Sequence, residues 1–157
     1  MDLAELKDNP REWWPAEKVA EVVKKHAEEV QADVIITFDS GGVSGHLNHR
    51  SVHRGLQHLT RSYPATTPPI FSSTTVFLLR KYSSIWDVTL TALPFLPNLI
   101  FSPHSENEDR ALFFATWSDY RAARRAFGKH ASQMSWDRHV YMVLSRYMMM
   151  NDLRRVR

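Results

Sequence analysis

The sequence contains no cysteine, and only five of its 157 residues are glycine. The absence of cysteine excludes a disulfide scaffold, a cysteine zinc finger and a cysteine nucleophile. Long hydrophobic runs are also absent: the longest apolar stretch covers about 92–101, and Pro94 and Pro97 interrupt it. A bilayer-spanning helix needs about 20 apolar residues, so we expect no such helix in this chain. The start of the chain mixes acidic and basic side chains and does not resemble a signal peptide.

What is present is a globular composition with an uneven distribution of charge. Hydrophobic residues make up 43% and charged residues 24% of the chain, which is typical of one folded domain at this length. Residues 1–39 hold ten acidic and five basic side chains, whereas residues 110–157 hold three acidic and ten basic ones. The basic C-terminal third is either a solvated arginine-rich surface or a surface that faces phosphates. No nucleic-acid-binding motif accompanies it, so we expect no nucleic acid partner.

Hydrophobic periodicity predicts helices that alternate with short strands. Valines and alanines that recur every three to four residues predict a helix over about 15–31. The run 34–38 is apolar without alternation, which is typical of a strand buried on both faces. The other predicted elements are a helix from His46 or Asn48 to Arg61, strands at 71–79 and 111–116, a helix from Ser118 to about Gly128 and a last, basic amphipathic helix over about 131–150. This order predicts an α/β fold with an open layered sheet.

The segment 37–49 (Thr-Phe-Asp-Ser-Gly-Gly-Val-Ser-Gly-His-Leu-Asn-His) is the best candidate for a functional site. It contains three of the five glycines and follows the strand predicted at 34–38, and in open α/β sheets sites form just beyond the carboxyl ends of strands. His46 and His49 are three residues apart and share one face of a helix. Such histidines are zinc ligands, acid–base groups or surface residues, and the glycine-rich turn itself could bind phosphate. We interpret His53 and His58 as residues of the helix surface.

Four segments, in order, resemble one known family. Segment 37–49 resembles the second signature of the LmbE-like zinc de-N-acetylases, and is most similar to the GlcNAc-phosphatidylinositol de-N-acetylases of GPI-anchor biosynthesis. The segments 76–82 (Val-Phe-Leu-Leu-Arg-Lys-Tyr) and 129–134 (Lys-His-Ala-Ser-Gln-Met) resemble two further family elements. Ser-Arg-Tyr-Met at 145–148, with Asn151, resembles the ending of the eukaryotic branch. The resemblance extends over about residues 10–155.

The resemblance implies a Rossmann-like three-layer open sheet and a single zinc ion. The implied reaction is hydrolysis of the acetamide of GlcNAc-phosphatidylinositol, the second step of GPI-anchor biosynthesis, at the cytosolic face of the endoplasmic reticulum membrane. By this resemblance His49 is a metal ligand, and His46 stabilises the oxyanion or protonates the leaving amine. The further candidates for orienting a ligand or binding substrate are Asp39, Ser44, Asn48, Arg80 and His130.

One departure from the family is large. The family's first signature, His-Pro-Asp-Asp, supplies two zinc ligands and the general base, and this sequence contains neither a His-Pro nor an Asp-Asp dipeptide. We therefore expect residues 1–157 to be a single partial domain that lacks the first strand unit and is inactive alone. The alternative is a non-catalytic binding or regulatory paralogue. We also expect peripheral membrane contact through the basic C-terminal third.

Overall fold

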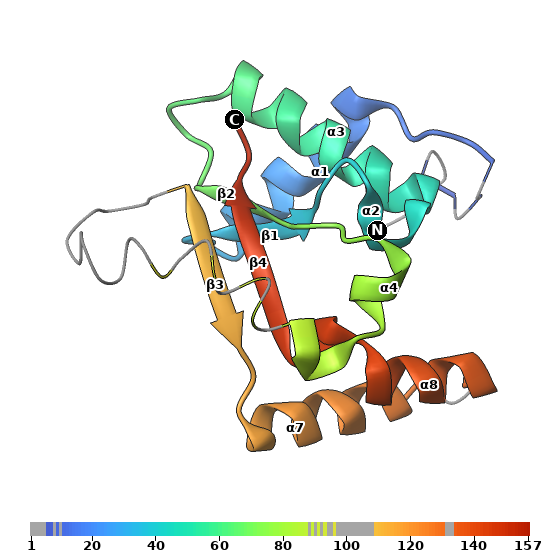
Figure 1. The fold of residues 1–157 in the computed structure, drawn as a ribbon. Helices are drawn as coiled ribbons and strands as arrows, with labels where there is room; N and C mark the ends of the chain where they lie inside the picture. The colour runs from blue at the N-terminus through green and yellow to red at the C-terminus, as the bar shows by residue number, and fades with distance from the viewer. Residues whose placement is uncertain are drawn as a thin grey trace. The chain divides into compact units, whose positions relative to one another are not determined.

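The computed structural model describes residues 6, 7, 9, 11–87, 89, 91, 93, 96, 109–130 and 134–157. Contacts divide the chain into two compact units (Figure 1). The first unit comprises Met1–Thr75 together with Leu153–Arg157, and the second comprises Val76–Asp152.

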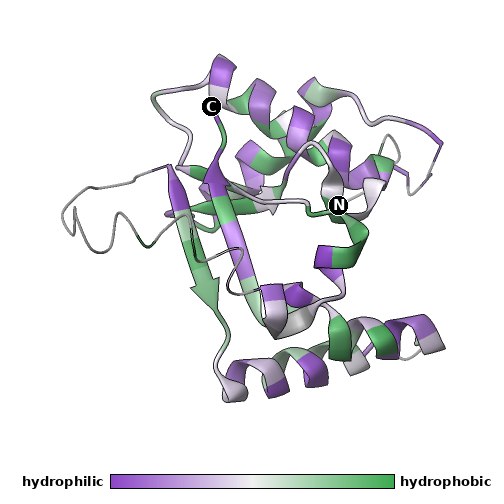
Figure 2. Cartoon of the chain, viewed as in Figure 1, coloured by the Kyte–Doolittle hydropathy of each residue, from purple (hydrophilic) through white to green (hydrophobic). Residues whose placement is uncertain are grey.

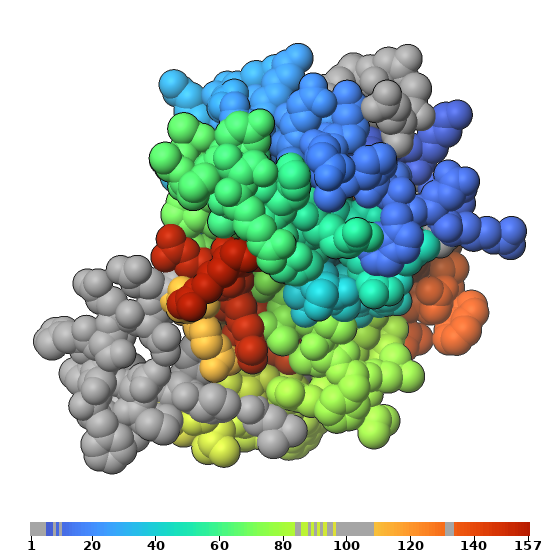
Figure 3. All heavy atoms as spheres, turned by 90° about the horizontal axis from the view of Figure 1, so that it is seen from above, coloured from blue at the N-terminus to red at the C-terminus, as the bar shows by residue number. Residues whose placement is uncertain are grey.

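Two helices form one layer of the first unit. Helix α1 (Ala16–Glu29) follows Pro15, as predicted, and α3 (Leu47–Ser62) packs against it; the two helices lie side by side in Figure 3. A Cβ atom at Gly55 would lie only 2.4 Å from Cγ1 of Val19, so the close approach of α1 and α3 requires glycine at this position. The buried core beneath the helices consists of Ala20, Leu56, Leu59, Ile70 and Val156.

The strands of the first unit lie under these helices. Strand β1 (Ile35–Phe38) pairs in parallel with β2 (Ile70–Ser73), and β2 pairs antiparallel with the end of β4 (Met150–Arg155). In the described residues only one face of β1 is covered: Thr37 is buried, whereas Ile36 is 62% exposed. The prediction that residues 34–38 are buried on both faces is therefore wrong for this structure.

The second unit holds the remaining elements. They are α4 (Leu78–Lys81), the 3-10 helix η1 (Ser84–Asp87), β3 (Arg110–Phe114), α7 (Trp117–Gly128), α8 (Trp136–Leu144), the 3-10 helix η4 (Arg146–Met148) and the beginning of β4. Helix α7 begins at a capping box in which the Thr116 hydroxyl accepts from the Asp119 N–H and the Asp119 carboxylate accepts from the Thr116 N–H. Thr116 is thus the capping residue, and the helix begins one residue before the predicted start at Ser118.

Two predicted elements need correction. The strand expected at 71–79 ends at Ser73, and Leu78–Lys81 is helical instead. The helix expected over about 131–150 covers only Trp136–Leu144 in the described residues, because Ser145 is extended (ψ 127°) and fully buried. The chain then forms β4, whose pairing with β2 links residues about 80 positions apart. Local periodicity cannot reveal a pairing over that separation.

The four strands found among the described residues occur in the order β1-β2-β4-β3, so the open α/β class that the sequence predicts is confirmed. Strand β3 is hydrophobic over most of its length (Figure 2). Among the described residues, no helix is both long enough and apolar enough to cross a bilayer.

Candidate functional site

The loop after β1 is organised by the carboxylate of Asp39. Its Oδ1 atom accepts hydrogen bonds from the backbone N–H groups of Gly41 and Gly42, both at 3.0 Å. Its Oδ2 atom accepts from the N–H of Thr75 at 2.6 Å, and the Thr75 hydroxyl also donates to the carboxylate. Asp39 therefore fixes the turn that leaves β1 and ties it to the segment that leaves β2.

The same loop has an unusual backbone conformation. Gly42, Val43 and Gly45 have positive φ angles of 61°, 63° and 79°. A positive φ is costly for a β-branched residue such as Val43, and such strain persists only where neighbouring contacts impose it. Here the Val43 N–H donates to the Thr75 hydroxyl oxygen at 2.8 Å. The strained, heavily hydrogen-bonded turn is typical of a segment that positions functional side chains.

His49 is held so that one ring nitrogen faces away from the loop. Its Nδ1 atom lies 3.0 Å from the carbonyl oxygen of Gly42, so Nδ1–H donates and Nε2 carries the lone pair of the neutral ring. The ring of Phe38 stacks on the imidazole with centroids 4.0 Å apart and an interplanar angle of 8°. This arrangement presents Nε2 as a potential metal ligand, with a carbonyl fixing the tautomer.

His46 has the opposite arrangement. It is the N-cap of α3, and its Nδ1 accepts from the N–H of Asn48 at 3.3 Å, so the neutral ring carries its proton on Nε2. The ring centroids of His46 and His49 are 5.2 Å apart, as expected from their spacing in the sequence. Nε2 of His49 can thus bind a metal, and Nε2–H of His46 can donate a hydrogen bond to an atom on which negative charge develops.

The other loop candidates have distinct places. Asn48 is buried at the start of α3, and Ser44 is exposed on the short helix α2 (Gly42–Gly45). We expected Asp39 to orient a histidine. Its carboxylate accepts from the N–H of Gly42, and the carbonyl oxygen of the same residue accepts from Nδ1–H of His49.

The two candidates outside the loop belong to the second unit. Arg80 donates from Nε and Nη2 to Asp87 at 2.6 and 3.1 Å, and these contacts give it a structural role. His130 lies just after α7 and lines a surface hollow of about 470 Å³ together with Phe127, Met134 and Arg138.

His53 was missed by the sequence analysis. It is buried, not on the helix surface as predicted, and its Nδ1 lies 3.0 Å from the carbonyl oxygen of Phe38. The hydrogen bond ties α3 to the last residue of β1. His53 lies four residues after His49, so both rings are on the face of α3 that meets the loop. This spacing was the feature of the sequence that could have predicted the position of His53.

The described residues do not by themselves form a complete metal site. No group of three His, Asp or Glu side chains lies close enough among them to hold one ion. A catalytic zinc takes three protein ligands and a water. The geometry of His49 is compatible with one of these ligands, and the described ranges do not complete the set.

Fold and loop together define a class. A glycine-rich, strained turn at the carboxyl end of a parallel strand, followed by a histidine pair at a helix start, is typical of a ligand-binding or catalytic site in an open α/β protein.

Comparison with known proteins shows which family the chain is similar to. The family model "PIG-L: GlcNAc-PI de-N-acetylase" matches residues 1–60, which include the loop and both histidines. The N-acetylglucosaminyl-phosphatidylinositol de-N-acetylase of Bos taurus is 31% identical over 154 residues, covering 98% of this chain and 56% of the bovine protein. The probable enzyme of the same name from Schizosaccharomyces pombe is 29% identical, covering 96% of this chain and 57% of the yeast protein. These matches confirm the resemblance to the GlcNAc-phosphatidylinositol de-N-acetylases that the sequence predicts.

The chain spans little more than half the length of these curated relatives. No solved structure matches it at a significant level.

Proposed function

We propose that this chain carries the histidine part of the active site of a zinc-dependent GlcNAc-phosphatidylinositol de-N-acetylase that acts at the endoplasmic reticulum membrane. The observation that supports the proposal best is the complementary pair of tautomers at His49 and His46. The names of the relatives support the substrate class.

Each histidine has a separate role in this proposal. His49 binds the metal through Nε2, because Nδ1–H is occupied by the Gly42 carbonyl. His46 donates from Nε2–H to the oxygen or nitrogen on which charge develops as the amide is cleaved. A bound zinc ion polarises the amide carbonyl and lowers the pKa of its water. The remaining zinc ligands and the general base are not among the described residues, and no reaction step is assigned to them.

The proposal is tested with the protein tagged at its C-terminus at its natural locus, so that the gene product is recovered as the cell makes it. We expect the isolated protein to release acetate from GlcNAc-phosphatidylinositol, and His49→Ala and His46→Ala each to reduce this rate by at least about 100-fold. His49→Ala should also lower the zinc content, because a ligand is lost, whereas His46→Ala should not. His58→Ala is the matched control, since this half-exposed residue of α3 forms a side-chain hydrogen bond with Ser62 and takes no part in the loop.

Equal zinc content in wild type and His49→Ala would contradict the ligand assignment. A protein that binds the glycolipid but releases no acetate would favour the alternative, a non-catalytic paralogue. We expect the 157-residue chain purified alone to show no deacetylation.

We also propose that the second unit contacts an anionic membrane surface. Large apolar side chains are exposed on α4 and α8, including Leu79 and Trp136, each 79% exposed; Figure 2 shows the hydrophobic start of α4. Lys81 links the two helices through its ammonium, which lies 5.6 Å from the ring centroid of Tyr141. Burial and the nearby charge of Arg138 lower the pKa of Lys81, and no carboxylate neutralises it in the part of the unit that is described. Exposed tryptophan and leucine beside a cation without a carboxylate partner, here Lys81, are typical of a surface that lies in the headgroup region.

Trp136→Ser is expected to weaken binding to phosphatidylserine-containing vesicles about tenfold, because the indole no longer enters the interface. Sedimentation with vesicles measures this, with pure phosphatidylcholine vesicles as the low-charge comparison. Tyr63→Ser removes an exposed aromatic ring from the first unit and should leave binding unchanged. Equal effects of the two substitutions would refute the proposed surface.

A further inference from the structure

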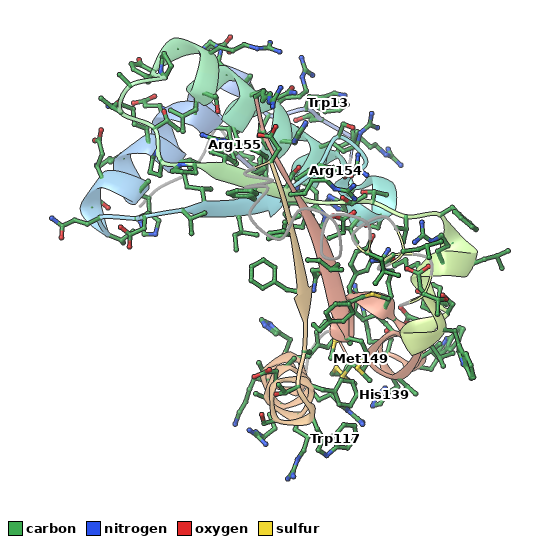
Figure 4. All side chains as sticks on the ribbon, turned by 60° about the vertical axis from the view of Figure 1, so that its left-hand side comes forward. Trp13, Trp117, His139, Met149, Arg154 and Arg155 are labelled. Atoms are coloured by element: carbon green, nitrogen blue, oxygen red, sulfur yellow. The ribbon has the colours of Figure 1, made fainter. Side chains whose placement is uncertain are left out.

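Two arginines of α3 stack against one tryptophan near the candidate site. The guanidinium carbon of Arg50 lies 5.0 Å from the ring centroid of Trp13, and that of Arg54 lies 4.9 Å from the same ring. Trp13 is at the surface of the first unit beside α3 (Figure 4). The three side chains form one cluster, which we call the Arg–Trp cluster.

Two hydrogen bonds of the next residue hold the segment that carries Trp13, and one of them joins it to α3. The N–H of Trp14 donates to the hydroxyl of Ser51 at 3.1 Å, and Ser51 is fully buried. The indole N–H of Trp14 donates to the carbonyl oxygen of Lys7 at 2.8 Å. Trp13 is therefore a fixed platform, and it limits the freedom of the two long arginine side chains.

The charges of the Arg–Trp cluster are not neutralised by the described residues. Arg50 uses Nε to donate to the carbonyl oxygen of Ser40 at 3.0 Å, and its two terminal nitrogens make no hydrogen bond there. Arg54 is exposed. Among the described residues, the one interaction of its guanidinium group is the cation–π contact with Trp13. Neither arginine pairs with a described carboxylate. Two ordered guanidinium groups with spare donors suit a phosphate or phosphate diester, because guanidinium matches the geometry of its oxygens.

The cluster continues the candidate site along α3. His46, Arg50 and Arg54 follow one another at intervals of four residues and share one face of the helix. At a rise of 1.5 Å per residue, Arg54 lies about 12 Å along the axis from His46. In GlcNAc-phosphatidylinositol the acetamide and the phosphate are separated by the amino sugar and the inositol ring. A molecule of this shape can reach the histidine pair and the Arg–Trp cluster together.

We propose that Arg50 and Arg54, held by Trp13, bind the phosphate diester of the glycosylated phosphatidylinositol substrate. The inference rests on the proposed function for the identity of the substrate, and the arginines act as binding and positioning residues, not in the bond-breaking step.

The test uses binding of soluble probes to the 157-residue chain, so it needs neither zinc nor deacetylation. Glycerophosphoinositol is titrated while the arginine Nε–H signals are followed by NMR, with inorganic phosphate as the second probe. We expect glycerophosphoinositol to shift the signals of Arg50 and Arg54, and Arg54→Gln to raise its dissociation constant about tenfold. Arg61→Gln removes the same charge from an exposed position in the last turn of α3 and should change the constant less than about twofold.

Trp13 provides an independent variant. Trp13→Ala removes the platform and should weaken binding, whereas Trp13→Phe retains an aromatic face and should retain most of it. Equal effects of Arg54→Gln and Arg61→Gln would overturn the proposal, and so would equal affinity for glycerophosphoinositol and inorganic phosphate. His49→Ala should not alter probe binding, so failure of the phosphate subsite and failure of the deacetylase proposal give different results.

Discussion

Replacement of Asp87 by asparagine is expected to lower the free energy of unfolding by about 3–5 kcal/mol, because it leaves buried positive charge without a partner. The Asp87 carboxylate accepts from Arg80 at 2.6 and 3.1 Å, and Nη1 of Arg146 lies 3.0 Å from Oδ2. Arg146 is only 2% exposed, so water cannot replace the lost carboxylate. Denaturant unfolding measures the change.

The same substitution should alter the dependence of stability on pH. Burial raises the pKa of Asp87, but hydrogen bonds from Arg80 and Thr91 and the charges of Arg146 and Arg80 outweigh it and hold the pKa below its ordinary value. The unfolded state then binds more protons than the folded state between the two pKa values, so stability rises with pH in that window. The contribution is complete above the ordinary aspartate pKa and is lost as the pH falls through the folded one.

Asp137→Asn is the matched control, because Asp137 is exposed and its pairing with Arg138 is long, at 3.8 Å. Its effect on unfolding should be much smaller. Similar losses for Asp87→Asn and Asp137→Asn would show that the buried carboxylate does not hold the second unit together.

Asp39→Asn is expected to destabilise the first unit by about 2–3 kcal/mol and to release the loop that carries the site. The carboxylate accepts from the N–H groups of Gly41, Gly42 and Thr75 and from the Thr75 hydroxyl, and an amide has only one accepting oxygen. The Gly42 peptide would lose its restraint, and so would the His49 ring bonded to it.

Two measurements separate loop release from a general loss of stability. Unfolding by denaturant gives the free energy, and the imidazole NMR signals report the tautomer of His49 under native conditions. Asp33→Asn, which alters an exposed carboxylate just before β1, should leave both unchanged. A normal His49 signal in Asp39→Asn would contradict the role of Asp39 in positioning the loop.

The sequence predicts the first unit more closely than the second. Helices α1 and α3, strand β1 and the proximity of His46 and His49 follow from local periodicity and spacing, because each depends on residues within a few turns. The tautomers of the histidines could not be predicted, since they depend on the carbonyl of Gly42 and on the N–H of Asn48.

The second unit depends on contacts between distant residues. The sequence suggests Arg80 as a candidate for substrate binding. The fold shows that its guanidinium group donates hydrogen bonds to Asp87 and Thr91. The end of α8 is set by the burial of Ser145 and by the pairing of β4 with β2, and neither is visible in a local hydrophobic pattern.

Gly55 is constrained by helix packing, whereas the residues of the candidate site are constrained by their chemistry. Any larger residue there collides with Val19 of α1, so selection acts on this position through helix packing and not through chemistry. His49 lies on the same helix and is constrained by its ring nitrogens. Across the relatives of this protein, invariant residues of α3 would therefore reflect two separate constraints, one from a helix contact and one from the proposed reaction. A paralogue that lost catalysis would be free to change position 49 while still retaining glycine at position 55.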